Sequence, residues 1–190
     1  MLPPTEQPPL VDDVSPSVTM ETDTVLMARE LPPRALEIWS SMLGLGLAPA
    51  ASDDDVATAV AGQRRWSGCI ALSGDWRGAV TVSCIDPLAR IVTGAMFGMT
   101  PEEASDAELQ DAIGELANIF GGQTKKVLSD RCVLGLPVVI EGDNFEATVP
   151  GSHAVVKLHF RCEGHPVEVS VVGANARVSP RRDSHRLSEN

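Results

Sequence analysis

Apolar and polar positions alternate with a helical period between residues 104 and 129. The apolar positions recur at intervals of three and four residues, which places them on one side of a helix. Ser105 or Asp106 can cap the start of this helix, and no proline interrupts the pattern before Pro137. The pattern therefore predicts a long amphipathic helix over about 104 to 129. Its apolar side comprises Leu109, Ala112, Ile113, Leu116 and Phe120.

The opposite side of this helix carries a polar stripe. Asp111, Glu115 and Asn118 fall within roughly 60° of one another around the axis, and Gly122 follows one turn later. The core does not need these side chains, so they are available for chemistry or for contact with a partner. Solvated helix faces are commonly composed of Asp, Glu and Asn, however, and geometry alone gives the stripe no function.

Three glycines in the same helix call for an explanation. Gly114, Gly121 and Gly122 each cost about 1 kcal/mol relative to alanine inside a helix. Close approach of another backbone would be one reason for glycine at these positions. Alternatively, Gly121 and Gly122 simply end the helix early.

Shorter patterns on either side predict the remaining elements. Pro32 and Pro33 set the start of a firm helix, while Asp86 and Pro87 resemble a cap followed by the first helical residue. The order helix, hairpin, two helices and several strands predicts an α+β domain, with a mainly antiparallel sheet and helices packed on one face. We expect helical segments at 24–29, 34–43 and 86–98, and strands at 65–72, 79–85, 133–141, 146–149, 153–162 and 166–173.

The chain of 190 residues is long enough for one well-buried domain with tails. Residues 1–22 are rich in proline and acidic side chains, which predicts a disordered arm. Residues 23–175 then form the single domain, and residues 176–190 form a disordered polar tail.

An oligomeric scaffold is an alternative class of function. In that case the chain would bury its polar helix stripe against a partner subunit.

Charge and composition exclude several classes of function. The net charge of −11 argues against nucleic acid, which is bound by clustered Lys and Arg. No apolar run approaches the roughly 20 residues of a membrane-spanning helix, and the N-terminus lacks the pattern of a signal peptide, so we expect a cytoplasmic protein without membrane insertion. The four cysteines form no CxxC pair, and we expect buried free thiols.

Two candidate ligand sites are weak. His153, His159 and His165 do not match a common zinc spacing, so structural or surface roles are favoured. The segment from Gly121 to Lys126 lacks the spacing of a phosphate-binding loop and follows a helix instead of a strand. We expect no metal site and no cofactor of the chain's own.

Together, the motifs between Trp66 and Gly173 resemble the CheC, CheX and FliY class of chemotaxis phosphatases, and most closely the CheX-like domain. The resemblance rests on a Gly-Asp-x-x-Gly turn at 74–78, on a helix ending in Met-Phe-Gly at 96–98, and on the polar stripe with the glycines that follow it. Pro137 matches a later proline of the pattern, and we assign it a structural role only.

The resemblance implies removal of the phosphoryl group from the aspartyl phosphate of a receiver-domain response regulator, in chemotaxis or a related two-component pathway. Glu115 would pair with the regulator's active-site lysine, and Asn118 would orient the attacking water. Asp111 and Gly122 would contact the regulator, which would bring its own Mg²⁺. Proteins of this class also pair through their sheets, so a homodimer is expected. The alternative is a module that binds a response regulator or a flagellar switch component without catalysis.

Overall fold

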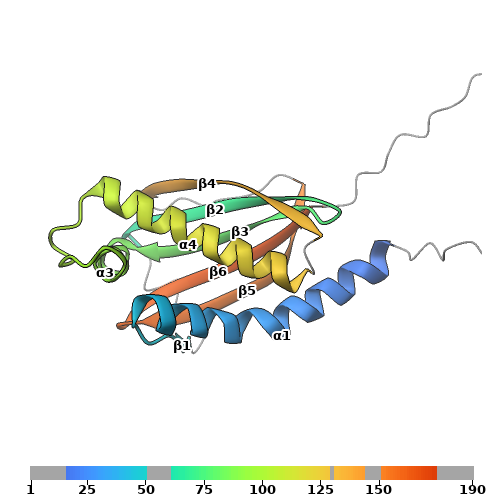
Figure 1. The fold of residues 1–190 in the computed structure, drawn as a ribbon, viewed down its shortest axis with the longest axis horizontal. Helices are drawn as coiled ribbons and strands as arrows, with labels where there is room; N and C mark the ends of the chain where they lie inside the picture. Colours follow the sequence, from blue (N-terminus) through green and yellow to red (C-terminus); the bar gives the residue numbers. More distant parts are fainter. Residues whose placement is uncertain (1–15, 51–60, 129–130, 144–150, 175–190) are drawn as a thin grey trace, which may run out of the picture.

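The computed structural model describes residues 16–50, 61–128, 131–143 and 151–174. Within these residues, a six-stranded antiparallel sheet carries three helices on one face (Figure 1). The order of strands across the sheet is β1-β5-β6-β3-β2-β4. This arrangement confirms the predicted α+β class. The elements are α1 (Pro16–Leu43), β1 (Ala48–Pro49), β2 (Arg64–Gly74), β3 (Gly78–Ile85), α3 (Asp86–Phe97), α4 (Asp106–Val127), β4 (Cys132–Asp143), β5 (Ser152–Cys162) and β6 (His165–Ala174).

The predicted hairpin of β2 and β3 lies near the middle of the sheet. The two strands pair in register from Arg65 opposite Ile85 to Leu72 opposite Gly78. Alternate residues of β2 face the helices, where Ile70 is fully buried. The structure therefore confirms the predicted strands at 65–72 and 79–85.

Helix α1 differs from the prediction of two short helical pieces. It begins at Pro16, inside the segment predicted as an arm, and it continues through Pro32 and Pro33. A bend in the helix is visible near its middle in Figure 1, as expected where prolines interrupt the backbone hydrogen bonds of a helix. Tertiary packing offsets this interruption, because one apolar stripe runs along both halves of the helix. Its buried members follow at intervals of four residues: Met27, Leu31, Ala35, Trp39 and Leu43.

The boundaries of α3 and α4 agree closely with the sequence pattern. Gly98 ends α3 in the left-handed conformation, with φ of 71°. Asp86 is not a cap, however; it is the first residue of α3, and Ile85 occupies the cap position. Helix α4 spans Asp106–Val127 and so continues past both Gly121 and Gly122. The prediction that these glycines could end the helix early is therefore wrong.

The strands after α4 match the predicted segments where the structure describes them. β4, β5 and β6 cover the predicted segments 133–141, 153–162 and 166–173. The short β1 was not predicted, and the predicted strand at 146–149 lies outside the described residues, as do residues 1–15 of the predicted arm and the whole predicted tail. Among the described helices, none is long and apolar enough to cross a membrane.

None of the four cysteines, which all lie in the described residues, forms a disulfide. Cys84, Cys132 and Cys162 are buried, as predicted, while Cys69 is half-buried. Burial raises the pKa of Cys84 to about 12, so this thiol stays protonated and unreactive at neutral pH.

Candidate functional site

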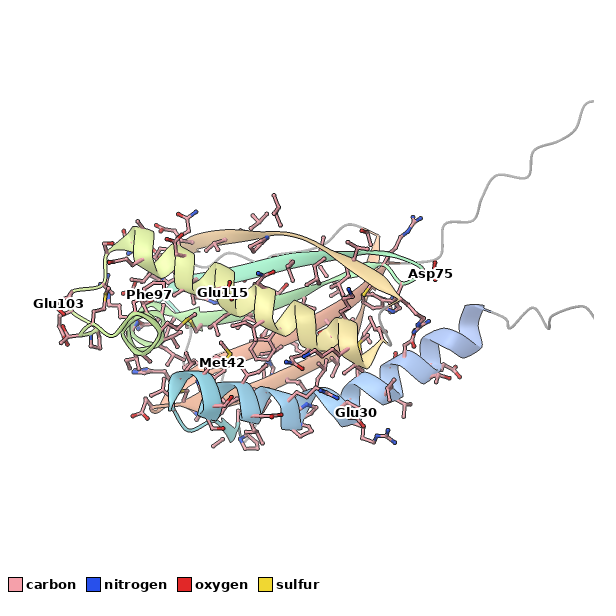
Figure 2. The ribbon with its side chains drawn as sticks, viewed as in Figure 1. Glu30, Met42, Asp75, Phe97, Glu103 and Glu115 are labelled. Atoms are coloured by element: carbon pink, nitrogen blue, oxygen red, sulfur yellow. The ribbon has the colours of Figure 1, made fainter. Side chains whose placement is uncertain are left out.

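The polar stripe of α4 lies on the outer side of the helix, away from the sheet. Asp111, Glu115 and Asn118 are all exposed, whereas Gly122 is half-buried. Figure 2 shows Glu115 on α4, on the side of the molecule where the three helices lie. The structure thus brings the predicted site residues together on one rigid element and leaves the three side chains accessible to another protein.

Close packing against β2 and β4 fixes the height of α4 above the sheet. A Cβ at Gly68 of β2 would lie 2.5 Å from the backbone oxygen of Ile113, and one at Gly121 would lie 2.7 Å from Cγ2 of Ile70. At Gly114 a Cβ would meet Val139 at an ordinary 3.5 Å. The close backbone contact expected at the helical glycines is thus found at a strand glycine, Gly68. Gly114 and Gly121 face side chains of β2 and β4, and a Cβ at Gly122 would meet nothing within 4 Å.

Pro137 contributes to the same contact between helix and sheet. Pro137 lies on β4, an edge strand, and pairs with Ile70 of β2. The missing N–H of proline is tolerated on such a strand. The Cγ of Pro137 lies 4.0 Å from the position of a Cβ at Gly114. This position is consistent with the structural role assigned to it from the sequence.

A capping box fixes the first turn of α4. The Ser105 hydroxyl accepts a hydrogen bond from the Glu108 amide, and the Glu108 carboxylate accepts one from the Ser105 amide at 2.8 Å. The hydroxyl and amide of Ser105 hold the pKa of the Glu108 carboxyl below its usual range. The first turn is therefore ordered where it leads into the polar stripe.

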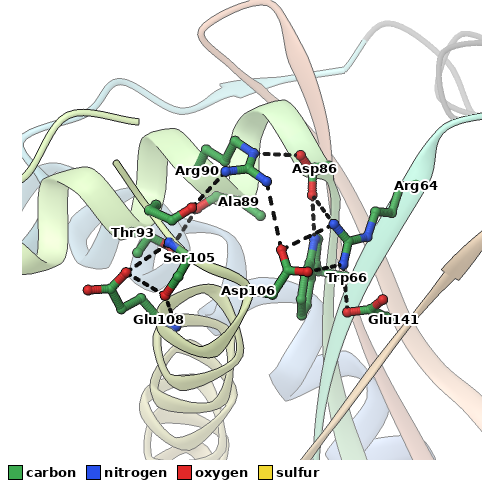
Figure 3. Close-up of polar contacts among 11 residues, drawn as sticks. Arg64, Trp66, Asp86, Ala89, Arg90, Thr93, Ser105, Asp106, Glu108 and Glu141 are labelled. Carbon is green, nitrogen blue, oxygen red and sulfur yellow. Dashed lines mark hydrogen bonds and ion pairs between the residues drawn. The ribbon is translucent and has the colours of Figure 1, made fainter. Parts of the chain in front are cut away.

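An ionic cluster around Arg64 ties the same turn to the sheet and to α3 (Figure 3). The Arg64 guanidinium pairs with Asp106 at 2.9 Å, with Glu141 at 2.8 Å and with Asp86 at 3.4 Å. It also lies over the Trp66 ring, 4.8 Å from the ring centroid. These contacts raise the pKa of Arg64 and lower that of Asp106, in each case chiefly through their mutual hydrogen bond.

Arg90 of α3 extends this cluster. It donates to Asp86 at 2.8 Å and to the backbone oxygen of Ala104 at 2.7 Å, so it holds the connection between α3 and α4. The sequence analysis missed the cluster, because its members are separated by up to 77 positions, from Arg64 to Glu141, and no local spacing connects them.

Helix α1 supports the other end of the stripe. The Arg34 guanidinium donates to the Gln123 side chain at 3.4 Å, and the Trp39 and Phe120 rings pack with centroids 6.1 Å apart. Both ends of α4 are therefore anchored, and the exposed residues between them are held in fixed relative positions.

The chemistry available on this surface is that of an amide and two carboxylates presented to a partner. The part of the chain that the structure describes holds no group of three or more His, Cys, Asp or Glu side chains placed to bind a metal ion. An amide can donate one hydrogen bond and accept another at the same time, without adding charge. A carboxylate can pair with a lysine of the partner.

A family model described as "Chemotaxis phosphatase CheX" matches residues 66–161, just over half of the chain. The chain belongs to the CheX family of chemotaxis phosphatases. The match includes β3, α3, α4 and β4 and nearly all of β2 and β5, and so the whole polar stripe. It confirms the resemblance seen in the sequence. No curated protein matches the chain significantly.

Solved structures confirm the fold. The chemotaxis protein CheX from Vibrio vulnificus is 19% identical, with a TM-score of 0.62 over 76% of this chain and 94% of that one. CheX in a CheX–CheY–BeF3–Mg²⁺ complex from Borrelia burgdorferi is 18% identical, with a TM-score of 0.60 over 78% and 97%. FliY from Thermotoga maritima is 15% identical, with a TM-score of 0.52 over 86% and 92%.

Proposed function

We propose that this protein removes the phosphoryl group from the aspartyl phosphate of a receiver-domain response regulator in chemotaxis or a related two-component pathway. One observation carries the proposal: Glu115 and Asn118 stand exposed, one turn apart, on a helix anchored at both ends. Family membership supports the class of reaction. A related CheX protein in complex with CheY, BeF3 and Mg²⁺ supports the class of partner.

In the proposed reaction, a water molecule attacks phosphorus in line with the bond to the aspartyl oxygen. A bond forms between the water oxygen and phosphorus, and the bond between phosphorus and the aspartyl oxygen breaks. The electron pair of that bond returns to the carboxylate, and the water's proton leaves with inorganic phosphate. Such a transfer depends mainly on positioning and on charge stabilisation, so a helix that inserts one side chain can catalyse it.

Asn118 has the role of orienting the water. Its amide oxygen can accept a hydrogen bond from the attacking water, while its NH2 group donates to the partner. A carboxylate at this position would repel the phosphoryl group. Because Asn118 is exposed, it can enter the active site of another protein.

Glu115 has the role of docking. It lies one turn before Asn118, so its carboxylate can pair with the lysine of the receiver's active site while the amide reaches the phosphoryl group. Asp111 and Gly122 lie before and after them along the stripe and would contact the receiver. The Mg²⁺ needed for the reaction would come with the receiver, and the protein would supply no cofactor.

The experiment is a measurement of phosphate loss from each phosphorylated receiver domain of the host, with and without the protein. We expect the wild type to accelerate this loss for a cognate receiver. Asn118→Ala should lower kcat by about 100-fold, as is typical when one positioned polar group is removed, with unchanged thermal stability. Glu115→Ala should mainly weaken binding.

If no receiver loses phosphate faster with the wild-type protein, the phosphatase proposal is wrong. Binding of a receiver without acceleration would then select the alternative, a module that binds a response regulator or a flagellar switch component. An unchanged affinity of Glu115→Ala would contradict the docking role of Glu115.

We also propose that two copies of the chain pair along β4. This strand forms one edge of the sheet, and it exposes large apolar side chains: Val133, Leu136, Val138 and Ile140. Leu136 is 87% exposed and Val138 is 60% exposed, which is unusual for neighbouring apolar residues on an edge strand. A second copy would cover these residues and leave the stripe of α4 accessible.

A further inference from the structure

The polar stripe is too small to account for binding of a receiver domain. A specific interface between proteins buries about 800 Å² on each partner. Three exposed polar side chains supply only part of that area, and polar contacts at a surface contribute more to orientation than to affinity. A receiver that brings its phosphoryl group to Asn118 must therefore cover neighbouring parts of the same surface.

Met42 is one apolar residue available there. It follows Ala35 by seven positions and Ile38 by four, which places it on the buried side of α1. Ala35 and Ile38 are 0% and 4% exposed, but Met42 is 50% exposed. Met42 therefore lies at the edge of the covered side of α1, next to Leu43, which is only 6% exposed.

Phe97 shows the same pattern at the end of α3. It follows the buried Thr93 by four positions, yet it is 46% exposed. Met96 and Met99, on either side of it, are only partly buried. Methionine side chains adapt readily to the shape of a partner, which suits a binding surface.

Both residues belong to helices next to the stripe. Figure 2 shows Met42, Phe97 and Glu115 on the helix-covered side of the molecule, and α3 contacts both α1 and α4. Around the axis of α4, Glu115 lies between Asn118 and Gln123, and Gln123 contacts Arg34 of α1. Glu115 is therefore on the side of the stripe that faces α1 and α3.

We propose that Met42 and Phe97 form the apolar part of the surface that binds the receiver domain. This inference rests on the proposed function. The partner presents apolar side chains next to its phosphorylated aspartate, and these cover Phe97 and Met42 when Asn118 enters the active site. The two residues add affinity and do not take part in the chemistry. They are thus determinants of partner choice, separate from Glu115 and Asn118.

The test uses the receiver that binds the wild-type protein most tightly when loaded with beryllium fluoride and Mg²⁺. Covering the exposed half of a phenylalanine removes on the order of 100 Å² from water, which corresponds to a change in Kd of about tenfold or more. We expect Phe97→Ala to raise Kd and KM about tenfold and Met42→Ala to raise them about fivefold. The kcat at saturating receiver should stay within about twofold of wild type.

Val25→Ala is the matched control, since Val25 is also an exposed apolar residue of α1, 68% exposed, but lies in its other half. It should leave Kd unchanged. Phe97→Leu keeps apolar bulk and should retain most of the affinity, so it tests the proposal even if Phe97→Ala does not fold. Thermal unfolding confirms that each variant is folded.

A Kd of Phe97→Ala and Met42→Ala equal to that of the wild type overturns this inference and leaves the phosphatase proposal intact. A loss of kcat with unchanged Kd also overturns it. If the two variants change only the oligomeric state, the surface binds a second copy instead of a receiver. If the wild type binds no receiver at all, both proposals fail.

Discussion

The contact between Gly68 and helix α4 offers a direct test of how this site is supported. Gly68→Ala adds one methyl group on the side of β2 that faces the helix. The new Cβ would lie 2.5 Å from the backbone oxygen of Ile113 and 3.0 Å from Cβ of Ala117. Neither atom belongs to the far end of a flexible side chain, so the helix itself must move.

The expected cost follows from these distances. An ordinary contact would require α4 to shift outward by about 0.9 Å, judged from usual van der Waals separations. Insertion of a methyl group into a well-packed core costs about 1–3 kcal/mol, and alanine recovers about 0.5 kcal/mol relative to glycine in a strand. We therefore expect Gly68→Ala to lower the free energy of unfolding by about 2 kcal/mol, which corresponds to a fall of about 4–8 °C in Tm.

Urea unfolding followed by circular dichroism measures this change, with an m-value equal to that of the wild type. Gly122→Ala is the matched control, because a Cβ at Gly122 would meet nothing within 4 Å. That variant should gain about 1 kcal/mol from the better helix propensity of alanine. Equal stability of Gly68→Ala and the wild type would refute the close contact between β2 and α4.

Two further predictions concern the ionic cluster and the sheet edge. Arg64 lowers the folded-state pKa of the Asp106 carboxyl. The stabilisation that ionised Asp106 provides is therefore present above its unfolded-state pKa and is lost as the pH falls through its folded-state pKa. Asp106→Asn should therefore show a smaller loss of Tm than the wild type between pH 6 and pH 2.5. Val138→Lys should convert a dimer to a monomer in analytical ultracentrifugation and leave the monomer folded; an unchanged mass would contradict pairing along β4.

The predicted helix at 104–129 and the hairpin of β2 and β3 follow from local patterns. The helix has its apolar residues at three- and four-residue spacing and a capping box at Ser105. In β2 of the hairpin, Trp66, Ile70 and Leu72 stand at alternate positions of the strand and are buried. Such elements bury one face against the rest of the protein, so the spacing of their apolar residues predicts which face is buried.

Helix α1 shows where local rules fail. The preference of proline for the first turn predicted a break at Pro32, but the buried residues Met27, Leu31 and Ala35 continue on one line across it. Packing of this line against the core outweighs the loss of backbone hydrogen bonds. The Arg64 cluster was also missed, because its contacts depend on how distant elements fold together.

The last glycine of the polar stripe connects the fold to the proposed function. Packing within this chain explains why residue 121 of α4 is glycine, since a side chain there would collide with Ile70. It does not explain Gly122, where a Cβ would meet nothing within 4 Å. A half-buried glycine inside a helix lowers stability by about 1 kcal/mol, and no described atom near Gly122 accounts for that cost. The proposed docking of a receiver domain, close to the helix one turn after Asn118, would account for it. Gly122→Ala should therefore stabilise the protein while raising Kd for the receiver, whereas a rise in stability with unchanged Kd would show that Gly122 is not part of the docking surface.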